Sequence, residues 1–141
     1  MAIERTDRFF DSLVHATADG TWLGGTRYDA GLGRLLHEME RVGSCRACLV
    51  AISGYQDNAT VAAMARDHPD LFVPIAGFNP VHFDRCQIPE AVASLAKQGF
   101  AGIKLHPRLN NYDPVDARAL ATIEVAGRYG MVVFLDTLFR Q

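Results

Sequence analysis

The chain has 141 residues, of which 49% are hydrophobic, and a formal net charge of -2 at pH 7. This apolar content is ample for one core, so we expect a single α/β domain over residues 1–141 and exclude a wholly disordered chain. The charge excludes the basic surface that binds nucleic acid, and no apolar run is long enough to cross a bilayer. The N-terminal residues lack the pattern of a secretory signal, and three cysteines make a poor disulfide framework, so we expect a cytoplasmic protein.

The first part of the chain alternates between strand and helix patterns. Residues 9–15 predict a strand with a polar exit, and a glycine-rich loop follows it. Asp29 is the expected N-cap of a helix that ends at Gly43. Apolar residues repeat at helical spacing between these two positions: Leu32, Leu35, Leu36 and Met39. Residues 46–52 are nearly all apolar, which is typical of a strand buried on both faces.

A second and a third helix pattern follow. We expect the second helix to begin near Asn58 and to stop at His68, before Pro69. Residues 71–78 predict the third strand. Pro89 suits the first turn of the third helix, and Gly99 closes that helix.

Ionisable side chains leave the end of the fourth strand, within residues 99–107, G-F-A-G-I-K-L-H-P. Successive strand residues point to opposite faces, so Ile103 and Leu105 share one face while Lys104 and His106 share the other. In parallel α/β proteins ligands bind beyond the C-terminal ends of the strands. Lys104 and His106 are therefore the first candidates for a binding site.

The last helix and strand complete the pattern. We expect residues 108–112 to form a loop, Asp113 to be the N-cap of the fourth helix and Pro114 to occupy its first position. This helix is predicted to bury three residues and to end at Gly130. The three residues are Ala117, Leu120 and Ile123. Residues 131–135 predict a fifth strand that brings Asp136 to the same end as Lys104 and His106.

The alternation of strands and helices predicts parallel strands and right-handed crossovers, and two architectures are compatible with it. One is part of a TIM barrel, with about five strands and four helices, and the other is a doubly wound five-stranded open sheet. The open sheet would need a last helix to cover its final strand, and none follows Asp136. A barrel needs about 200 residues or more, so the chain would be roughly the first half, with open edges that invite self-association or a complementing chain.

Residues 88–137 carry an ordered series of local patterns: E-A-V-A-S-L-A-K-Q-G-F-A-G-I-K-L-H-P, the loop to Asp113-Pro114, and A-G-R-Y-G-M-V-V-F-L-D-T. This series resembles the central part of the metal-dependent amidohydrolase family, in the branch called amidohydrolase-related or amidohydrolase 2. Two earlier segments, R-L-L-H-E-M-E-R-V-G-S-C-R-A-C-L-V and H-P-D-L-F-V-P-I-A-G-F-N-P, are similar to that family as well. The resemblance implies a TIM barrel, a divalent metal, and hydrolysis or decarboxylation of a small molecule.

The chain departs from the family pattern at the expected metal ligands. The family's first strand usually ends Asp-x-His-x-His, and the aligned residues here run from Asp11 to His15, with Leu13 in place of one histidine. Asp136 stands where the family usually has a histidine, and a carboxylate can replace imidazole on zinc or manganese. The family's remaining histidine and its late aspartate would lie beyond Gln141. The resemblance leaves His15 and Asp136 as metal ligands, with His106 or Lys104 as further candidates, for zinc or manganese, and it assigns no catalytic residue.

Each candidate residue also has a purely structural interpretation. Lys104 either makes an interior salt bridge to Asp136 or Asp11, or binds a ligand. His106 either caps the strand or contacts substrate, and His15 is either functional or a satisfied polar group. The candidate substrate contacts are Lys104, His106, Arg108 and Tyr112; Trp22 and Tyr28 are candidates to line a pocket.

Three functions remain open. The first is a hydrolase that cleaves a small-molecule amide, ester or lactone with metal-activated water, or catalyses a related decarboxylation. The second is a truncated or inactive relative that acts as a binding or assembly subunit, which Leu13 favours. The third is an open-sheet module that binds a ligand.

Overall fold

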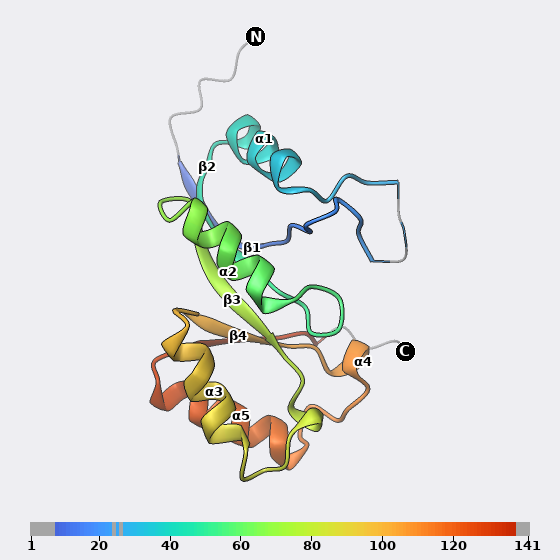
Figure 1. Cartoon of the computed structure of the whole chain (residues 1–141), viewed down its shortest axis with the longest axis vertical. Helices are drawn as coiled ribbons and strands as arrows, with labels where there is room; N and C mark the ends of the chain where they lie inside the picture. The colour runs from blue at the N-terminus through green and yellow to red at the C-terminus, as the bar shows by residue number, and fades with distance from the viewer. Residues whose placement is uncertain (1–7, 24, 26, 138–141) are drawn as a thin grey trace.

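The computed structural model describes residues 8–23, 25 and 27–137. In these residues five parallel strands form one sheet in the order β1-β2-β3-β4-β5 (Figure 1). The strands are β1 (Phe9–Val14), β2 (Ser44–Val50), β3 (Phe72–Phe78), β4 (Gly102–Leu105) and β5 (Val132–Leu135). The helices are α1 (Leu32–Val42), α2 (Asn58–Asp67), the 3-10 turn η1 (Pro80–His82), α3 (Ile88–Lys97), α4 (Pro107–Asn110) and α5 (Ala117–Arg128).

The strand order decides between the two expected architectures. Each strand pairs with the next one along the chain, and right-handed crossovers then place all the connecting helices on one face of the sheet. A doubly wound sheet instead reverses its strand order partway. The sheet curls into a half-barrel, so the partial TIM barrel is confirmed and the doubly wound alternative is wrong.

Apolar side chains cover both faces of the sheet. The larger cluster fills the space between the sheet and the helices, and it includes Ile103 and Leu105 of β4. A smaller cluster lies on the concave face, which is the inner face of a barrel. Its members are Cys48, Val50 and Ile75, with Val73 and Phe134 packed against them. The two faces of β4 therefore differ as the alternation predicts.

A close approach of two strands shapes the end of β3. A Cβ atom added to Gly77 would lie 2.5 Å from the backbone nitrogen of Ser53, which follows the end of β2. Asn58, the first residue of α2, accepts a hydrogen bond from the Gly77 N–H at 2.8 Å and donates to the Gly77 carbonyl oxygen at 3.1 Å. These contacts fix the start of α2 to the end of β3.

Two expected helix caps are wrong. Gly31 is the N-cap of α1, whereas the Asp29 carboxylate accepts a hydrogen bond from the Gly31 N–H at 2.8 Å, in the turn before the helix. Asp116 is the N-cap of α5, and Asp113 accepts a hydrogen bond from the Val115 N–H at 2.9 Å in a separate turn. In both places an aspartate forms a local turn just before the helix begins.

The later start of α5 changes its buried face. Leu120, which was expected inside, is 51% exposed, Ala117 is exposed, and Ile123 is only partly buried. The buried residues of α5 are Ala119, Thr122, Val125 and Ala126.

Three smaller boundary differences accompany this change. Residues 108–112, expected as a loop, contain most of the short helix α4, which begins at Pro107. The second strand begins at Ser44 and ends at Val50, two residues earlier at each end than expected. The third strand begins at Phe72 rather than Leu71.

Candidate functional site

Three predicted site residues meet where β4 and β5 end. The Lys104 side chain and the His106 side chain leave β4 on the concave side, and Asp136 follows β5. The Asp136 N–H donates to the Leu105 carbonyl oxygen at 3.0 Å, which holds Asp136 beside β4. Asp136 Oδ2 lies 3.2 Å from His106 Nε2 and 3.9 Å from Lys104 Nζ. We call Lys104, His106 and Asp136 the strand-end cluster.

Lys104 is a buried cation in a loose ion pair. Its residue surface is only 7% exposed, and in the register of the sheet it lies between Gly77 and Phe134. Burial lowers the pKa of Lys104, and the negative charge of Asp136 partly opposes this effect. A separation of 3.9 Å is too long for a hydrogen bond, so Asp136 attracts the ammonium group without accepting its protons. The interior salt bridge expected for Lys104 is therefore present, with Asp136 as its partner.

The surroundings of His106 favour the neutral form of its imidazole ring. Burial lowers its pKa, Asp136 raises it, and the charges of Lys104 and Arg108 lower it further. We assign the ring proton to Nε2, because Nε2 lies 3.2 Å from a carboxylate oxygen of Asp136, which can only accept. Nδ1 is buried and has no hydrogen-bond partner in the described part of the chain. A lone pair on Nδ1 is therefore left to accept a proton or a ligand's hydrogen bond.

His15 lies at the same end of the sheet, at the exit of β1. Its Nδ1 is 2.6 Å from the Val50 carbonyl oxygen, which can only accept, so Nδ1 carries the ring proton. Its ring packs against that of Trp22 with the centroids 5.0 Å apart. Burial lowers the pKa of His15 most, and the charges of Lys104 and His106 lower it further. His15 is therefore electrostatically coupled to the strand-end cluster.

The predicted metal ligands do not make a complete metal site. Across residues 8–23, 25 and 27–137, no group of three His, Cys, Asp or Glu side chains is arranged to hold a metal ion. Catalytic zinc takes three protein ligands, and Leu13, which has no donor atom, is 40% exposed at the position of a family ligand. His15 and Asp136 stay a predicted pair of ligands.

The other two predicted substrate contacts lie on the segment that follows β4. Arg108 is exposed in α4. The Tyr112 hydroxyl is buried beside the backbone of His106, and burial raises the pKa of Tyr112 to about 12. This hydroxyl has no hydrogen-bond partner among the described residues. The role of both side chains as substrate contacts remains a prediction.

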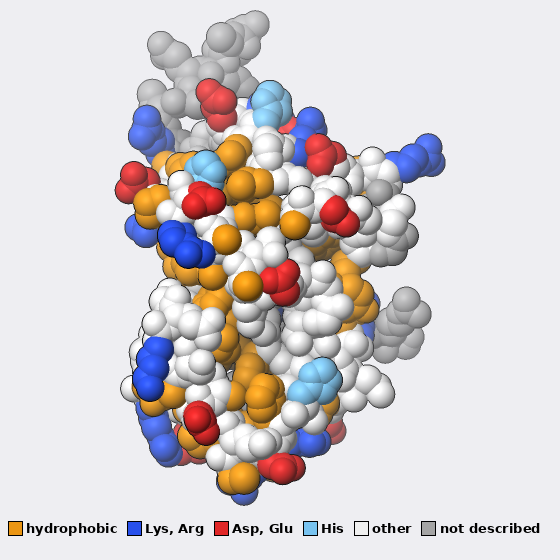
Figure 2. Space-filling model, viewed as in Figure 1, with side chains coloured by type: hydrophobic (Ala, Val, Ile, Leu, Met, Phe, Trp, Pro, Cys, Tyr) orange, Lys and Arg blue, Asp and Glu red, His pale blue; other side chains and the backbone are white. Residues whose placement is uncertain are grey.

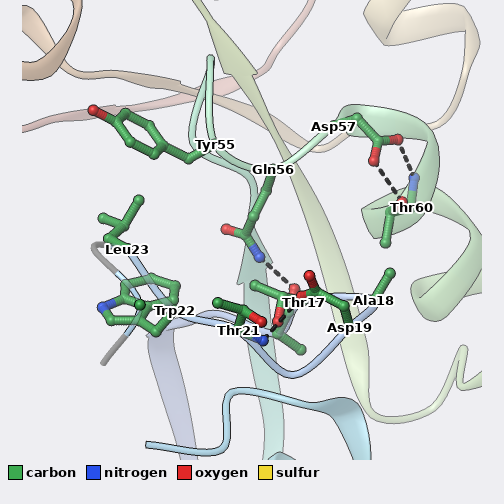
Figure 3. A pocket seen from close by; sticks show the side chains of 12 residues that line it. Thr17, Ala18, Asp19, Thr21, Trp22, Leu23, Tyr55, Gln56, Asp57 and Thr60 are labelled. Carbon is green, nitrogen blue, oxygen red and sulfur yellow. Dashed lines mark hydrogen bonds between the residues drawn. The ribbon is translucent and has the colours of Figure 1, made fainter. Parts of the chain in front are cut away.

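The structure also has a cavity next to His15. It has a volume of about 450 Å³ and lies between the loops that follow β1 and β2 (Figure 3). Trp22 lines it, as expected for a pocket residue, whereas Tyr28 is 79% exposed and is not part of its lining. Gln56 also lines the cavity. A single glutamine after a turn has no sequence pattern that would have identified Gln56 as a cavity residue.

Family membership follows from the sequence comparison. Residues 17–140 match the model of the family described as Amidohydrolase. This chain belongs to the amidohydrolase family. No match was found among curated proteins.

Solved structures show the same fold as this amidohydrolase chain at low sequence identity. A probable 2-pyrone-4,6-dicarboxylic acid hydrolase from Acinetobacter baumannii, with citric acid bound, is 16% identical with a TM-score of 0.63. A 5-carboxyvanillate decarboxylase from Novosphingobium aromaticivorans, complexed with manganese and 4-hydroxy-3-methoxy-5-nitrobenzoic acid, is 16% identical with a TM-score of 0.59.

The alignments cover 89% and 72% of the amidohydrolase chain, but only 48% and 33% of the two solved structures. The chain thus spans about half or less of their length. At this identity the likeness shows the fold alone. No described helix is both long and apolar enough to cross a membrane.

Proposed function

We propose that this amidohydrolase chain acts on a small organic acid, by hydrolysis or decarboxylation, at the strand-end cluster. The observation that carries the proposal is the buried Lys104 ammonium group, 3.9 Å from Asp136 and beside a neutral His106. A buried ammonium group held by a loose ion pair is suited to bind a second carboxylate, from a ligand. The ligands named for the two solved relatives, citric acid and a nitrobenzoic acid, are both carboxylic acids.

The residues of the cluster have separate roles in this proposal. Lys104 binds the substrate carboxylate and stabilises negative charge that develops in the reaction. His106 accepts or donates a proton at Nδ1, because its Nε2 is engaged with Asp136. Asp136 fixes the tautomer and orientation of the ring, as a carboxylate does for a catalytic histidine. Arg108 and Tyr112 remain proposed contacts to the rest of the substrate.

A divalent metal ion, zinc or manganese, is the cofactor that the family resemblance implies. The described residues offer the pair His15 and Asp136 rather than three ligands, so no step of the reaction is derived through a metal. Metal content of the purified chain tests the pair. One bound ion that His15→Ala removes supports it, and an active, metal-free chain contradicts it.

Turnover tests the proposed function. The full chain is incubated with 2-pyrone-4,6-dicarboxylate and with 5-carboxyvanillate, and loss of each compound is followed by NMR. We expect Lys104→Met to lower kcat/KM by about 100-fold, the size typical of a lost electrostatic contact. The matched control is Lys97→Met, which removes the other lysine of the chain from the exposed last turn of α3 and is expected to leave turnover unchanged.

A second candidate, a binding subunit without activity, is favoured by the lack of a three-ligand metal group among the described residues. Citrate binding distinguishes the two functions. Binding that Lys104→Met abolishes, without turnover of either compound, supports the binding subunit. Absence of both binding and turnover contradicts both candidates.

A further inference from the structure

The cavity beside His15 is built from two loops that meet above the sheet. Residues 16–23 and 25 follow β1, residues 55–60 include the start of α2, and side chains from both segments surround a volume of about 450 Å³ (Figure 3). Gln56 ties the loops together, because its Nε2 donates to the Ala16 carbonyl oxygen. The cavity is therefore part of the folded structure rather than a surface irregularity.

The lining carries negative charge and no positive charge. Asp19 and Asp57 line the cavity, and its described lining residues include no Lys, Arg or His. The backbone N–H of Thr21 holds the pKa of Asp19 below its usual value, and the hydroxyl and N–H of Thr60 do the same for Asp57. Both carboxylates are thus ionised at neutral pH. The cavity favours a cation over an anion.

Asp57 also accounts for the nearby end of α2. As its N-cap, Asp57 accepts hydrogen bonds from the Thr60 N–H at 2.8 Å and from the Thr60 hydroxyl at 2.6 Å. The positive end of a helix attracts anions, but here the protein's own carboxylate already occupies that position. The helix end therefore does not reverse the preference for a cation.

An acceptor inside the cavity lacks a donor. Gln56 is only 9% exposed, and its bond to Ala16 turns Oε1 the other way, toward the side where Leu23 and Trp22 lie (Figure 3). Oε1 lies near the His15 ring but meets the geometry of a hydrogen bond with no described residue. Buried carbonyl oxygens are normally paired, so this one has the capacity to accept a hydrogen bond from a ligand's N–H or O–H group.

We propose that this cavity binds an organic ammonium group carried on an aromatic or apolar body. An ammonium group supplies several N–H donors, which suit the Asp19 and Asp57 carboxylates, and the Gln56 oxygen is an acceptor for a donor on the body of the ligand. Trp22 and Tyr55, which also line the cavity, offer ring faces to the cation and apolar surface to the body of the ligand.

The cavity adjoins the strand-end cluster without belonging to it. His15 packs on Trp22 on one side, and on the other its pKa is lowered by the charges of Lys104 and His106. Lys104 suits a carboxylate, whereas the cavity suits the opposite charge. The inference therefore goes beyond the proposed function and does not depend on it.

Fluorescence of Trp22, the single tryptophan of the chain, reports binding without any assay of activity. The full chain is titrated with benzylammonium, with benzyl alcohol and with benzoate, which share a ring and differ in charge. We expect a saturable change with benzylammonium, with a Kd about tenfold or more below that of benzyl alcohol, and no saturable change with benzoate.

Charge-removing variants test the two carboxylates. Asp57→Asn keeps a good N-cap, and Asp19→Asn changes only an exposed turn, so either variant keeps the test open if the other fails to fold. Each is expected to raise the Kd for benzylammonium about tenfold. The matched control is Asp113→Asn, because Asp113 accepts a backbone N–H two residues on at 2.9 Å, as Asp19 does. The control should leave the Kd unchanged.

Three outcomes would overturn the proposal: no saturable change with benzylammonium, equal affinity for benzyl alcohol, or an unchanged Kd in both cavity variants. Loss of benzylammonium binding in Asp113→Asn would also count against it, because the effect would then not be local.

Discussion

Single residues carry the chemistry of the strand-end cluster. Strand alternation predicted that Lys104 and His106 share a face, and parallel strands predicted that Asp136 joins them. The sequence could not show which polar atoms have a hydrogen-bond partner or how far apart the charged groups lie. The unpaired Nδ1 of His106 and the 3.9 Å ion pair of Lys104 depend on how tightly the following segment packs over the strand end.

Tyr112 gives a prediction at this scale. Its hydroxyl is buried without a partner among the described residues, so removing it relieves a desolvation cost. Tyr112→Phe is expected to keep the free energy of unfolding or raise it by up to about 1 kcal/mol, as measured by urea denaturation. An alkaline absorbance titration should lose the ionisation step at about 12.

Tyr129→Phe is the matched control, because Tyr129 is 51% exposed. It should retain that late step. A loss of more than about 1 kcal/mol in Tyr112→Phe would mean that the hydroxyl has a partner in solution, and would contradict the assignment.

At the scale of elements, sequence patterns located each of the described strands but misjudged some helix starts. Periodicity and the closing glycines Gly43 and Gly99 depend on neighbouring residues alone, so they were found. The N-cap of α5 was expected at Asp113 because Asp-Pro is a strong local signal. The chain forms a turn there first, and the buried face of α5 was therefore assigned to the wrong residues.

Gly77 gives a prediction about the packing of β3 on β2. An added Cβ would lie 2.5 Å from the Ser53 nitrogen and 2.9 Å from the Ile52 carbonyl carbon, and backbone atoms cannot move aside as a flexible side chain can. Gly77→Ala is therefore expected to lower the free energy of unfolding by at least about 2 kcal/mol, as measured by urea denaturation.

Gly127→Ala is the opposite case. Gly127 lies within α5, and a Cβ added there meets no atom within 4 Å, so helix propensity should raise stability by about 0.5–1 kcal/mol. If Gly77→Ala and Gly127→Ala changed the free energy of unfolding in the same direction and by the same amount, the result would contradict the close approach of Gly77 to the Ser53 backbone.

At the scale of the molecule, the half-barrel has two sheet edges, β1 and β5, each with one neighbouring strand among the described residues. Large apolar side chains are exposed on both edge strands: Phe9, Phe10 and Leu13 on β1, and Val132 and Leu135 on β5. Figure 2 shows apolar side chains at the surface of one face of the molecule, including the waist between its two halves. Open parallel edges with apolar side chains favour further strand pairing.

We propose that the chain associates through these edges, with itself or with a complementing chain. The molar mass in solution, measured by light scattering over a range of concentrations, should exceed that of a monomer. Phe10→Lys and Val132→Lys should reduce association, because charged edges resist pairing. Leu120→Lys should not, because Leu120 is 51% exposed on the helix α5 rather than on an edge strand. A monomer at every concentration would contradict self-association and leave a complementing chain as the only partner.

The central claim is that the ends of β4 and β5 bring Lys104, His106 and Asp136 close enough for the charges of Lys104 and Asp136 to shift the pKa of His106. An NMR titration measures the pKa of the His106 ring directly, and the signal that is missing in His106→Asn identifies this ring. We predict a pKa below 6.5 in the unaltered chain, a still lower pKa in Asp136→Asn and a higher one in Lys104→Met, because Asp136 raises the pKa and Lys104 lowers it. A pKa near 6.5 in all three proteins would show that these residues do not meet.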